Sequence, residues 1–179
     1  MVDIWFVSDT HFNHANILNF KDDKGNLIRP GFKDVDHMNN VMIDNWNKVV
    51  KPQDKIYHLG DVSFGNGDLM IAILKRLNGH KRLVMGNHDI YDILYYAEYF
   101  EKVSSWRQFM DMPKPFVCTH YPLHPGSFEY RGAVWNVHGH IHQNVVMKSS
   151  VPDNRYINIC VEKTNYTPIH LDELMSLMK

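Results

Sequence analysis

The segment that decides the fold is residues 82–89, Arg-Leu-Val-Met-Gly-Asn-His-Asp. A largely apolar run that stops at a glycine is typical of a buried strand ending in a turn. Asn87, His88 and Asp89 follow directly, at the place where open α/β sheets bind their ligands. Because Gly-Asn-His-Asp is also an ordinary turn sequence, its interpretation depends on the rest of the chain.

The same order of elements occurs earlier in the chain. Apolar strands are expected over residues 4–7 and 55–59, and each runs into a loop that carries an aspartate. Helices are expected over residues 34–49, 68–77 and 90–99, where apolar side chains recur at three- to four-residue spacing. Strand, acid-bearing loop and helix in succession predict parallel strands with right-handed crossovers, which places all three loops at one edge of the sheet.

The second half of the chain has a different pattern. Short segments rich in β-forming residues, separated by turns, are expected as strands over residues 103–110, 116–118, 134–137, 145–147 and 156–160. They predict a second, mixed or antiparallel sheet, followed by a closing helix over 171–178. With 179 residues, the chain is expected to form a single α/β domain over residues 1–179.

Composition excludes several classes of protein. The chain is 44% hydrophobic and 22% charged, and no apolar run approaches the roughly 18 residues that a membrane span needs. Its start does not resemble a signal peptide, so we expect a cytoplasmic protein whose cysteines, Cys118 and Cys160, are buried thiols. A net charge of −1 gives no reason to expect a long nucleic-acid partner. Twelve histidines are the unusual feature.

Several of these histidines, with aspartates and an asparagine, follow expected strands. They are Asp9 and His11, then Asp61, then Asn87 and His88, then His120, then His140 and His142. Residues two apart in an extended segment point the same way, so Asp9 and His11 can reach one ion, and His140 and His142 are expected on one side of their segment. Any one of these residues is explained by a cap, a turn or the surface; five strand ends of the same kind indicate a common site.

The chemistry of this set favours a metal. Imidazole, carboxylate and amide ligands suit borderline divalent ions, namely Mn, Fe, Ni or Zn, and no thiolate arrangement of a structural zinc site is present. Seven ligands are too many for one catalytic ion with an open position. They suit two ions that share a carboxylate and clamp the attacking and leaving oxygens of an in-line displacement.

Five blocks in this order resemble the motifs of the calcineurin-like metallophosphoesterase superfamily. They are Asp9-x-His11, Gly60-Asp61, Gly86-Asn87-His88-Asp89, His120 and Gly139-His140-x-His142. The resemblance implies a two-sheet, mixed β-sandwich flanked by helices. It also implies one metal on Asp9, His11, Asp61 and His142, and a second on Asp61, Asn87, His120 and His140, with Asp61 bridging. His88 then matches a catalytic histidine that binds no metal and faces the scissile phosphate.

The function implied is that of a binuclear, metal-dependent phosphoesterase in which a metal-bridging hydroxide attacks phosphorus in line. Small phosphodiesters, nucleotides among them, are the expected substrates, and manganese is one of the expected metals. The alternatives are a phosphomonoesterase, a nuclease on short or single-stranded nucleic acid, and a non-catalytic metal-binding scaffold. No basic groove is evident in the sequence, which disfavours nucleic acid, and the oligomeric state stays open.

The sequence departs from the family pattern after Gly60-Asp61, where protein phosphatases carry an arginine and this chain has Val-Ser-Phe-Gly over residues 62–65. The candidates for substrate binding are His14, Arg29 and His124, and Tyr121 is a further candidate for lining the pocket. His58 either supports a metal ligand or is a satisfied core residue. Asp89 is expected to shape the turn or to cap the next helix rather than to bind metal.

Overall fold

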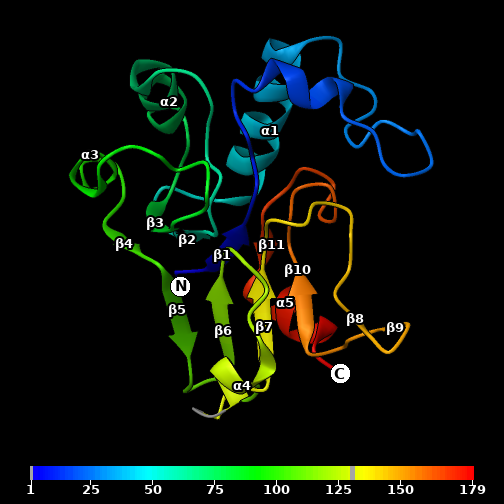
Figure 1. Cartoon of the computed structure of the whole chain (residues 1–179). Coiled ribbons are helices and arrows are strands. Elements are labelled where there is room, and N and C mark those ends of the chain that lie inside the picture. The colour runs from blue at the N-terminus through cyan, green and yellow to red at the C-terminus, as the bar shows by residue number, and fades with distance from the viewer. Residues whose placement is uncertain (1, 130–131) are drawn as a thin grey trace.

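The computed structural model describes residues 2–129 and 132–179, which form two stacked β-sheets with helices on the outside (Figure 1). The first sheet has the strand order β11-β1-β2-β3-β4. Its strands are β1 (Ile4–Val7), β2 (Lys55–His58), β3 (His80–Val84), β4 (Lys102–Ser104) and β11 (Ile169–His170). The strands β1 to β4 are parallel; the sequence predicts this for β1, β2 and β3 but not for β4. Strand β11 pairs with β1 in the antiparallel sense.

The second sheet has the strand order β10-β7-β6-β5 and is mixed. Its strands are β5 (Trp106–Phe109), β6 (Phe116–Thr119), β7 (Trp135–His138) and β10 (Tyr156–Asn158). The pair β5–β6 is antiparallel, whereas β6–β7 and β7–β10 are parallel. The carboxyl ends of β6 and β7 therefore point in the same direction, toward the first sheet in Figure 1.

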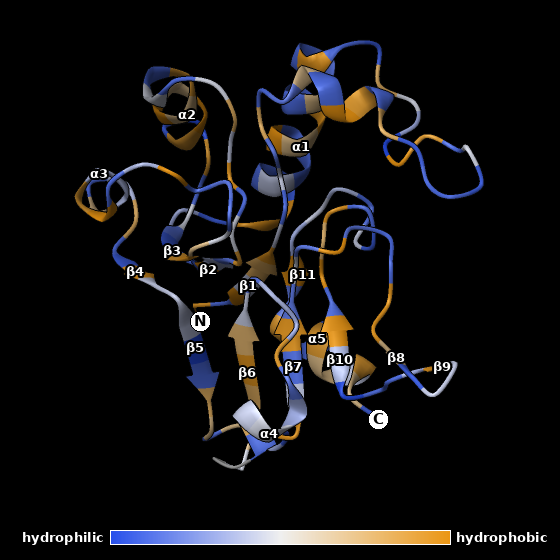
Figure 2. Cartoon of the chain, viewed as in Figure 1, coloured by the Kyte–Doolittle hydropathy of each residue, from blue (hydrophilic) through white to orange (hydrophobic). Residues whose placement is uncertain are grey.

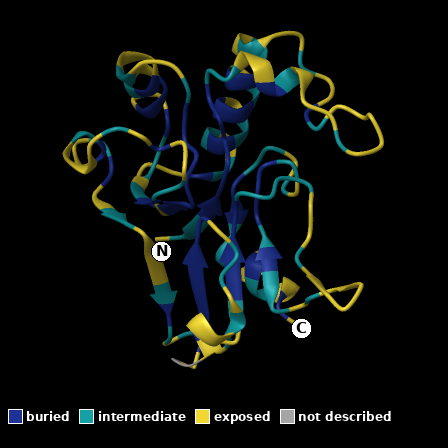
Figure 3. Cartoon of the chain, in the orientation of Figure 1, coloured by how far each residue is buried: buried dark blue, intermediate teal, exposed yellow. Residues whose placement is uncertain are grey.

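The helices pack around the two sheets. They are α1 (Val35–Val49), α2 (Gly67–Leu74), α3 (Ile93–Ala97), α4 (Pro125–Phe128), α5 (Leu171–Leu177) and a 3-10 turn, η1 (Ala15–Asn19). Side chains of α1, α2 and α3 pack on the first sheet, around Trp46, Met70 and Tyr96. A second core lies between the two sheets, around Phe6 and Phe116, and α5 contributes Leu174 to it. In Figures 2 and 3 the central strand β6 is largely apolar and buried, whereas the edge strand β5 is largely polar and exposed.

Three expectations from the sequence are corrected. Residues 103–110 form two strands rather than one, because the chain leaves the first sheet after β4 and enters the second at β5. The segment near 145–147 lies outside the second sheet, in a hairpin of β8 (Met147–Lys148) with β9 (Val151–Pro152). Helix α3 is five residues long, shorter than predicted.

Backbone hydrogen bonds hold the loops that follow the strands against one another. The amide of Asp9 donates to the carbonyl of Gly60 at 3.0 Å, and that of His11 donates to the carbonyl of Asp61 at 3.0 Å. In the second sheet, the amide of Gly139 donates to the carbonyl of His120 at 2.9 Å. The polar strand ends of both sheets thus meet at one edge of the sandwich. In the described part of the chain, no helix has the length and apolar character that crossing a membrane requires.

Candidate metal centre

The loops at this edge have unusual backbone geometry. Left-handed φ angles, between 47° and 69°, occur at Asp9, His11, Asp61, His140 and His142. Such angles cost about 1–2 kcal/mol for a residue with a Cβ, although Asp and His tolerate them better than most. The expectation that Asp9 and His11 converge because their segment is extended is therefore wrong. Their side chains converge because the backbone turns sharply at each of them.

The carboxylate of Asp9 is buried and its two oxygens have different surroundings. Its Oδ2 accepts hydrogen bonds from the Ser8 hydroxyl at 2.5 Å, the His140 amide at 2.9 Å and the Cys160 thiol at 3.2 Å. Its Oδ1 has no hydrogen-bond partner among the described residues. Burial alone would raise the pKa of Asp9, but the imidazoles of His11 and His120 hold it below its usual value. One oxygen is thus fully engaged and the other is left to a ligand.

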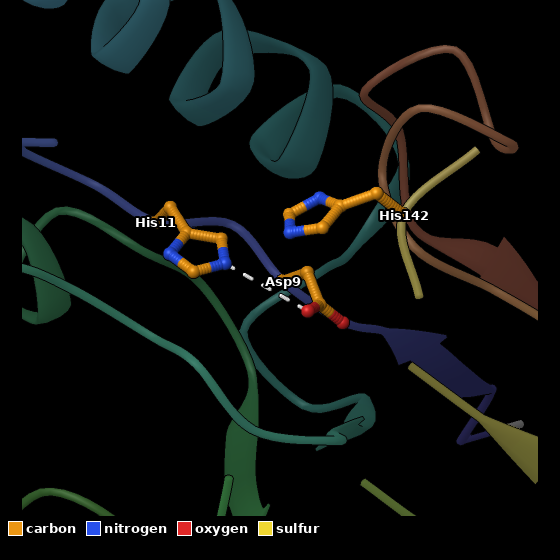
Figure 4. Close-up of side chains that lie close together, drawn as sticks. All are labelled: Asp9, His11 and His142. Carbon is orange, nitrogen blue, oxygen red and sulfur yellow. Dashed lines mark ion pairs between the residues drawn. The ribbon is translucent and has the colours of Figure 1, made fainter. Parts of the chain in front are cut away.

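That unpartnered oxygen faces two histidines. Atoms of Asp9, His11 and His142 able to bind one ion lie within 4.8 Å of one another, and Figure 4 shows the three side chains converging. The His11 ring is buried, and both of its nitrogens lack hydrogen-bond partners in the described structure. Burial lowers the pKa of His11 to about 4, against the raising effect of Asp9, so its imidazole is neutral at neutral pH. Neutral imidazole is the form that binds metal.

A second group of candidate ligands consists of Asp61, His120 and His140, again within 4.8 Å. The Nδ1–H of His120 donates to the carbonyl of Leu59 at 2.8 Å, so in a neutral ring Nε2 carries the lone pair. That Nε2 lies 2.9 Å from Oδ1 of Asn87. Two acceptor atoms at this distance are stabilised by a cation that both of them contact.

Asp61 lies between the two groups. Its Oδ2 is 3.5 Å from Nε2 of His11 and 3.5 Å from Nε2 of His120, which belong to different groups. Its Oδ1 accepts a hydrogen bond from the backbone amide of His88 at 2.9 Å. Burial raises the pKa of Asp61 to about 6. This carboxylate is therefore costly to keep charged without a neighbouring cation, as expected of a residue between two metals.

Two glycines permit the close approach of the loops. A Cβ at Gly86 would lie 2.3 Å from Oδ1 of Asp61, and one at Gly139 would lie 2.2 Å from Oδ2 of Asp9. Neither glycine has a left-handed φ. Gly86, which the sequence marks as a turn former, is needed because the Asp61 carboxylate passes directly over its backbone.

Asp89 fastens two loops together, in agreement with its predicted turn-shaping role. Its carboxylate is buried and accepts three backbone hydrogen bonds: from Asp61 at 2.9 Å, Val62 at 3.0 Å and Gly86 at 2.8 Å. The loop after β2 is thereby held to the loop after β3. Asp89 contributes to the position of Asp61 and Asn87 without belonging to either group of ligands.

His58 is a satisfied core histidine beneath these loops. Its Nδ1 accepts a hydrogen bond from the Gly60 amide at 3.2 Å, so its Nε2–H donates to the Thr10 hydroxyl at 2.9 Å. The hydroxyl donates in turn to the carbonyl of Val62 at 2.8 Å. Burial lowers the pKa of His58 to about 3. Of the alternatives left open by the sequence, the core position holds, although the residue also links the loops after β1 and β2.

On the solvent side of the two groups, Phe64 contacts two histidines. The His14 ring stacks on Phe64 with 3.7 Å between centroids, and the exposed His88 ring lies 4.7 Å from it. The centroids of His11 and His88 are 5.6 Å apart. Burial and the Arg29 charge lower the pKa of His14 to about 4. The structure thus places His14 and His88 beside the centre. Phe64, from the segment 62–65 that differs from the family pattern, lies between their rings.

One of the substrate-binding candidates, Arg29, is corrected by its surroundings. Arg29 is fully buried: its Nη2 donates to the carbonyl of Asp9 at 2.5 Å, its Nη1 to that of Thr10 at 2.8 Å, and its Nε to Glu162 at 2.7 Å. With its donors directed at the protein, it has no access to a substrate. His124 is exposed and caps α4, where its Nδ1 accepts from the Gly126 amide at 3.2 Å, and its role in substrate binding stays a prediction.

Glu162 belongs to the site although the sequence did not indicate it, and Tyr121, a candidate from the sequence for lining the pocket, lies beside it. Oε1 of Glu162 accepts from Nδ1–H of His142 at 3.0 Å, and the Tyr121 ring lies 4.6 Å from that of His140. Glu162 lies four residues after the end of β10, just beyond the strand expected over residues 156–160, so it shows the same kind of signal as the ligands: a polar side chain soon after a strand. Tyr121 is 47% exposed and forms part of the rim.

Comparison with known proteins identifies the architecture. The model of the calcineurin-like phosphoesterase family matches residues 2–176. An uncharacterised protein of Methanocaldococcus jannaschii is 34% identical over 180 residues, covering 98% of this chain and 91% of its own. The crystal structure of a protein of unknown function from Aquifex aeolicus has a TM-score of 0.76 and 30% identity, covering 99% of this chain and 100% of its own. The gene 66 protein of Mycobacterium phage L5 is 33% identical over 92 residues, which are 50% of this chain and 41% of the phage protein.

Proposed function

The chain belongs to the calcineurin-like phosphoesterase family, and on that basis we propose that it is a binuclear metal-dependent phosphoesterase. Within that class, we propose hydrolysis of small phosphodiesters, with Mn, Fe, Ni or Zn as the metal. The observation that most supports the binuclear proposal is the position of Asp61. One carboxylate oxygen lies 3.5 Å from an imidazole nitrogen of each ligand group, as a residue shared by two ions requires.

The residues present fit two divalent ions. Asp9 Oδ1 and His11 Nε2 are buried without hydrogen-bond partners among the described residues, and His120 Nε2 faces the Asn87 amide oxygen. Asp9, His11, Asp61 and His142 would hold one ion, and Asp61, Asn87, His120 and His140 the other. When bound, such ions stabilise the charge of a phosphoryl group and make water nucleophilic near neutral pH.

The chain's own residues would supply positioning and proton transfer. His88 is exposed and belongs to neither ligand group, and its backbone amide donates to Oδ1 of Asp61. Its ring would therefore be available to protonate a leaving oxygen. Because His14 is neutral at neutral pH, its imidazole would bind a phosphate oxygen through a hydrogen bond rather than through charge. Phe64 keeps the two rings apart.

A substrate panel tests this proposal. The metal-free protein is loaded with Mn, Ni or Zn and assayed on a bis-aryl phosphodiester, an aryl phosphomonoester, cyclic nucleotides and single-stranded DNA. We expect the diester to have the highest kcat/KM. Preference for the aryl monoester would replace the phosphodiesterase assignment by a phosphomonoesterase. No turnover of any substrate by protein that holds two ions would favour a metal-binding scaffold.

A second candidate function, cleavage of short single-stranded nucleic acid, is supported by a cavity the sequence did not reveal. A cavity of about 510 Å³ lies along β2 to β5 and is lined by four cationic residues, Lys55, Arg82, Lys102 and Arg107, and by no acidic one among the described residues. Two of its lining residues, Val84 and Ser104, are the last residues of β3 and β4, and the loop that carries Asn87 follows β3. If this function is correct, Lys102→Glu lowers kcat/KM on DNA and leaves that on the bis-aryl diester unchanged.

Cytoplasmic location, a single domain over residues 1–179 and a small phosphate ester as the partner stay predictions. Cell fractionation tests the first, limited proteolysis the second, and the substrate panel the third. The two cysteines, Cys118 and Cys160, are buried free thiols, as predicted.

A further inference from the structure

A buried ion pair, Arg29–Glu162, connects to one of the two ligand groups and not to the other. The guanidinium and the carboxylate are 2.7 Å apart, with side chains 0% and 3% exposed. Arg29 lies in the loop before α1, and Glu162 follows β10, so the pair joins segments 133 residues apart. Ion pairs at such depth are costly to desolvate and give little net stability. The burial of Arg29 and Glu162 is therefore better explained by a role in positioning other groups than by a contribution to stability.

Each partner contacts the machinery of the first ligand group. Arg29 donates to the carbonyls of Asp9 and Thr10, which are part of the left-handed turn that brings Asp9 and His11 together. Glu162 accepts from Nδ1–H of His142, which leaves Nε2 of that ring as the atom with the lone pair. All three candidate ligands, Asp9, His11 and His142, are thus oriented by one pair of side chains. The described hydrogen bonds of Arg29 and Glu162 include none to Asp61, His120 or His140.

We propose that Arg29 and Glu162 are positioning residues for the ion held by Asp9, His11 and His142, and that they set its affinity independently of the second ion. This inference rests on the proposed binuclear function. A carboxylate that accepts the proton of a ligating imidazole fixes the tautomer and raises the basicity of the ring. Loss of such an outer partner lowers metal affinity by about 10- to 100-fold. The expected effect is confined to one of the two ions.

The test measures Mn²⁺ binding to the metal-free protein by titration calorimetry, without any substrate. We expect Glu162→Gln to weaken one of two Mn²⁺ sites by about 10- to 100-fold and to leave the other within a factor of three. Asn87→Ala is the reciprocal variant, because Asn87 contacts His120, and it is expected to weaken the other site. The double variant then weakens both sites. The matched control is Glu101→Gln, which breaks the Arg82–Glu101 pair, whose residues belong to neither ligand group, and is expected to leave both sites unchanged.

The outcomes separate this inference from the proposed function. If the wild-type protein binds fewer than two Mn²⁺ ions, the binuclear proposal fails. If it binds two, and Glu162→Gln binds both as the wild type does, weakens both equally, or weakens the site that Asn87→Ala weakens, the positioning role is refuted. Should Glu162→Gln fail to fold by circular dichroism, Arg29→Lys replaces it. Lysine keeps the charge but lacks the fork that contacts two carbonyls, and the same single site is expected to weaken.

Discussion

Replacing Asp89 by asparagine tests whether the loops of the metal centre are held by one buried carboxylate. An asparagine of the same shape keeps an oxygen in the place of Oδ2, facing the amides of Asp61 and Gly86. Its NH₂ group then faces the Val62 amide, where the carboxylate had accepted at 3.0 Å. One buried N–H loses its acceptor, and two charge-assisted hydrogen bonds become neutral.

The magnitude follows from these three bonds. The unsatisfied N–H costs about 1–3 kcal/mol, and each bond that becomes neutral loses about 1 kcal/mol. The lower cost of burying a neutral amide offsets part of this sum, so we expect a net destabilisation of about 2–3 kcal/mol. With a urea dependence of about 2 kcal/mol per M, the unfolding midpoint falls by about 1 M or more.

The assay is urea unfolding of the metal-free protein in EDTA, followed by the fluorescence of its four tryptophans. The control is Asp92→Asn, the same replacement at an exposed N-cap that accepts a single amide hydrogen bond, from Leu94. We expect this control to lose about 1 kcal/mol or less. The reasoning is refuted if Asp89→Asn is no more destabilising than Asp92→Asn.

Three further predictions concern the centre itself. His88→Ala should bind two metal ions, since His88 belongs to neither ligand group, yet lose about 100-fold or more in kcat; unchanged turnover removes it from the mechanism. Asp61→Asn should reduce metal stoichiometry by elemental analysis, and normal loading with two ions would disprove the bridging assignment. For His58, the folded pKa of about 3 lies below the usual 6.5. As the pH is lowered, the unfolded chain therefore takes up a proton before the folded chain does, and stability decreases. Between pH 7 and pH 5 in EDTA, the wild-type protein should lose about 2 kcal/mol more than His58→Gln, and parallel pH profiles would contradict this.

Short-range pattern was enough to predict much of the framework. The first three parallel strands and helix α1 lie close to where apolar runs and apolar periodicity predict them, and Asp34 caps the helix. These features depend on neighbours a few residues apart. The chain's passage from β4 to β5 was not predicted, because residues 103–110 form one continuous β-like run and only the pairing partners distinguish the two sheets.

For the site, the sequence by itself determined which residue types gather at the strand ends, because parallel strands bring their carboxyl ends to a common edge. It did not determine how they converge. The segment with left-handed turns at Asp9 and His11 accepts hydrogen bonds from Arg29, a residue that sequence reasoning assigned to the substrate. Only the tertiary structure decided that Arg29 is buried against Glu162, since that contact joins residues 133 positions apart and no local pattern reports such a distance.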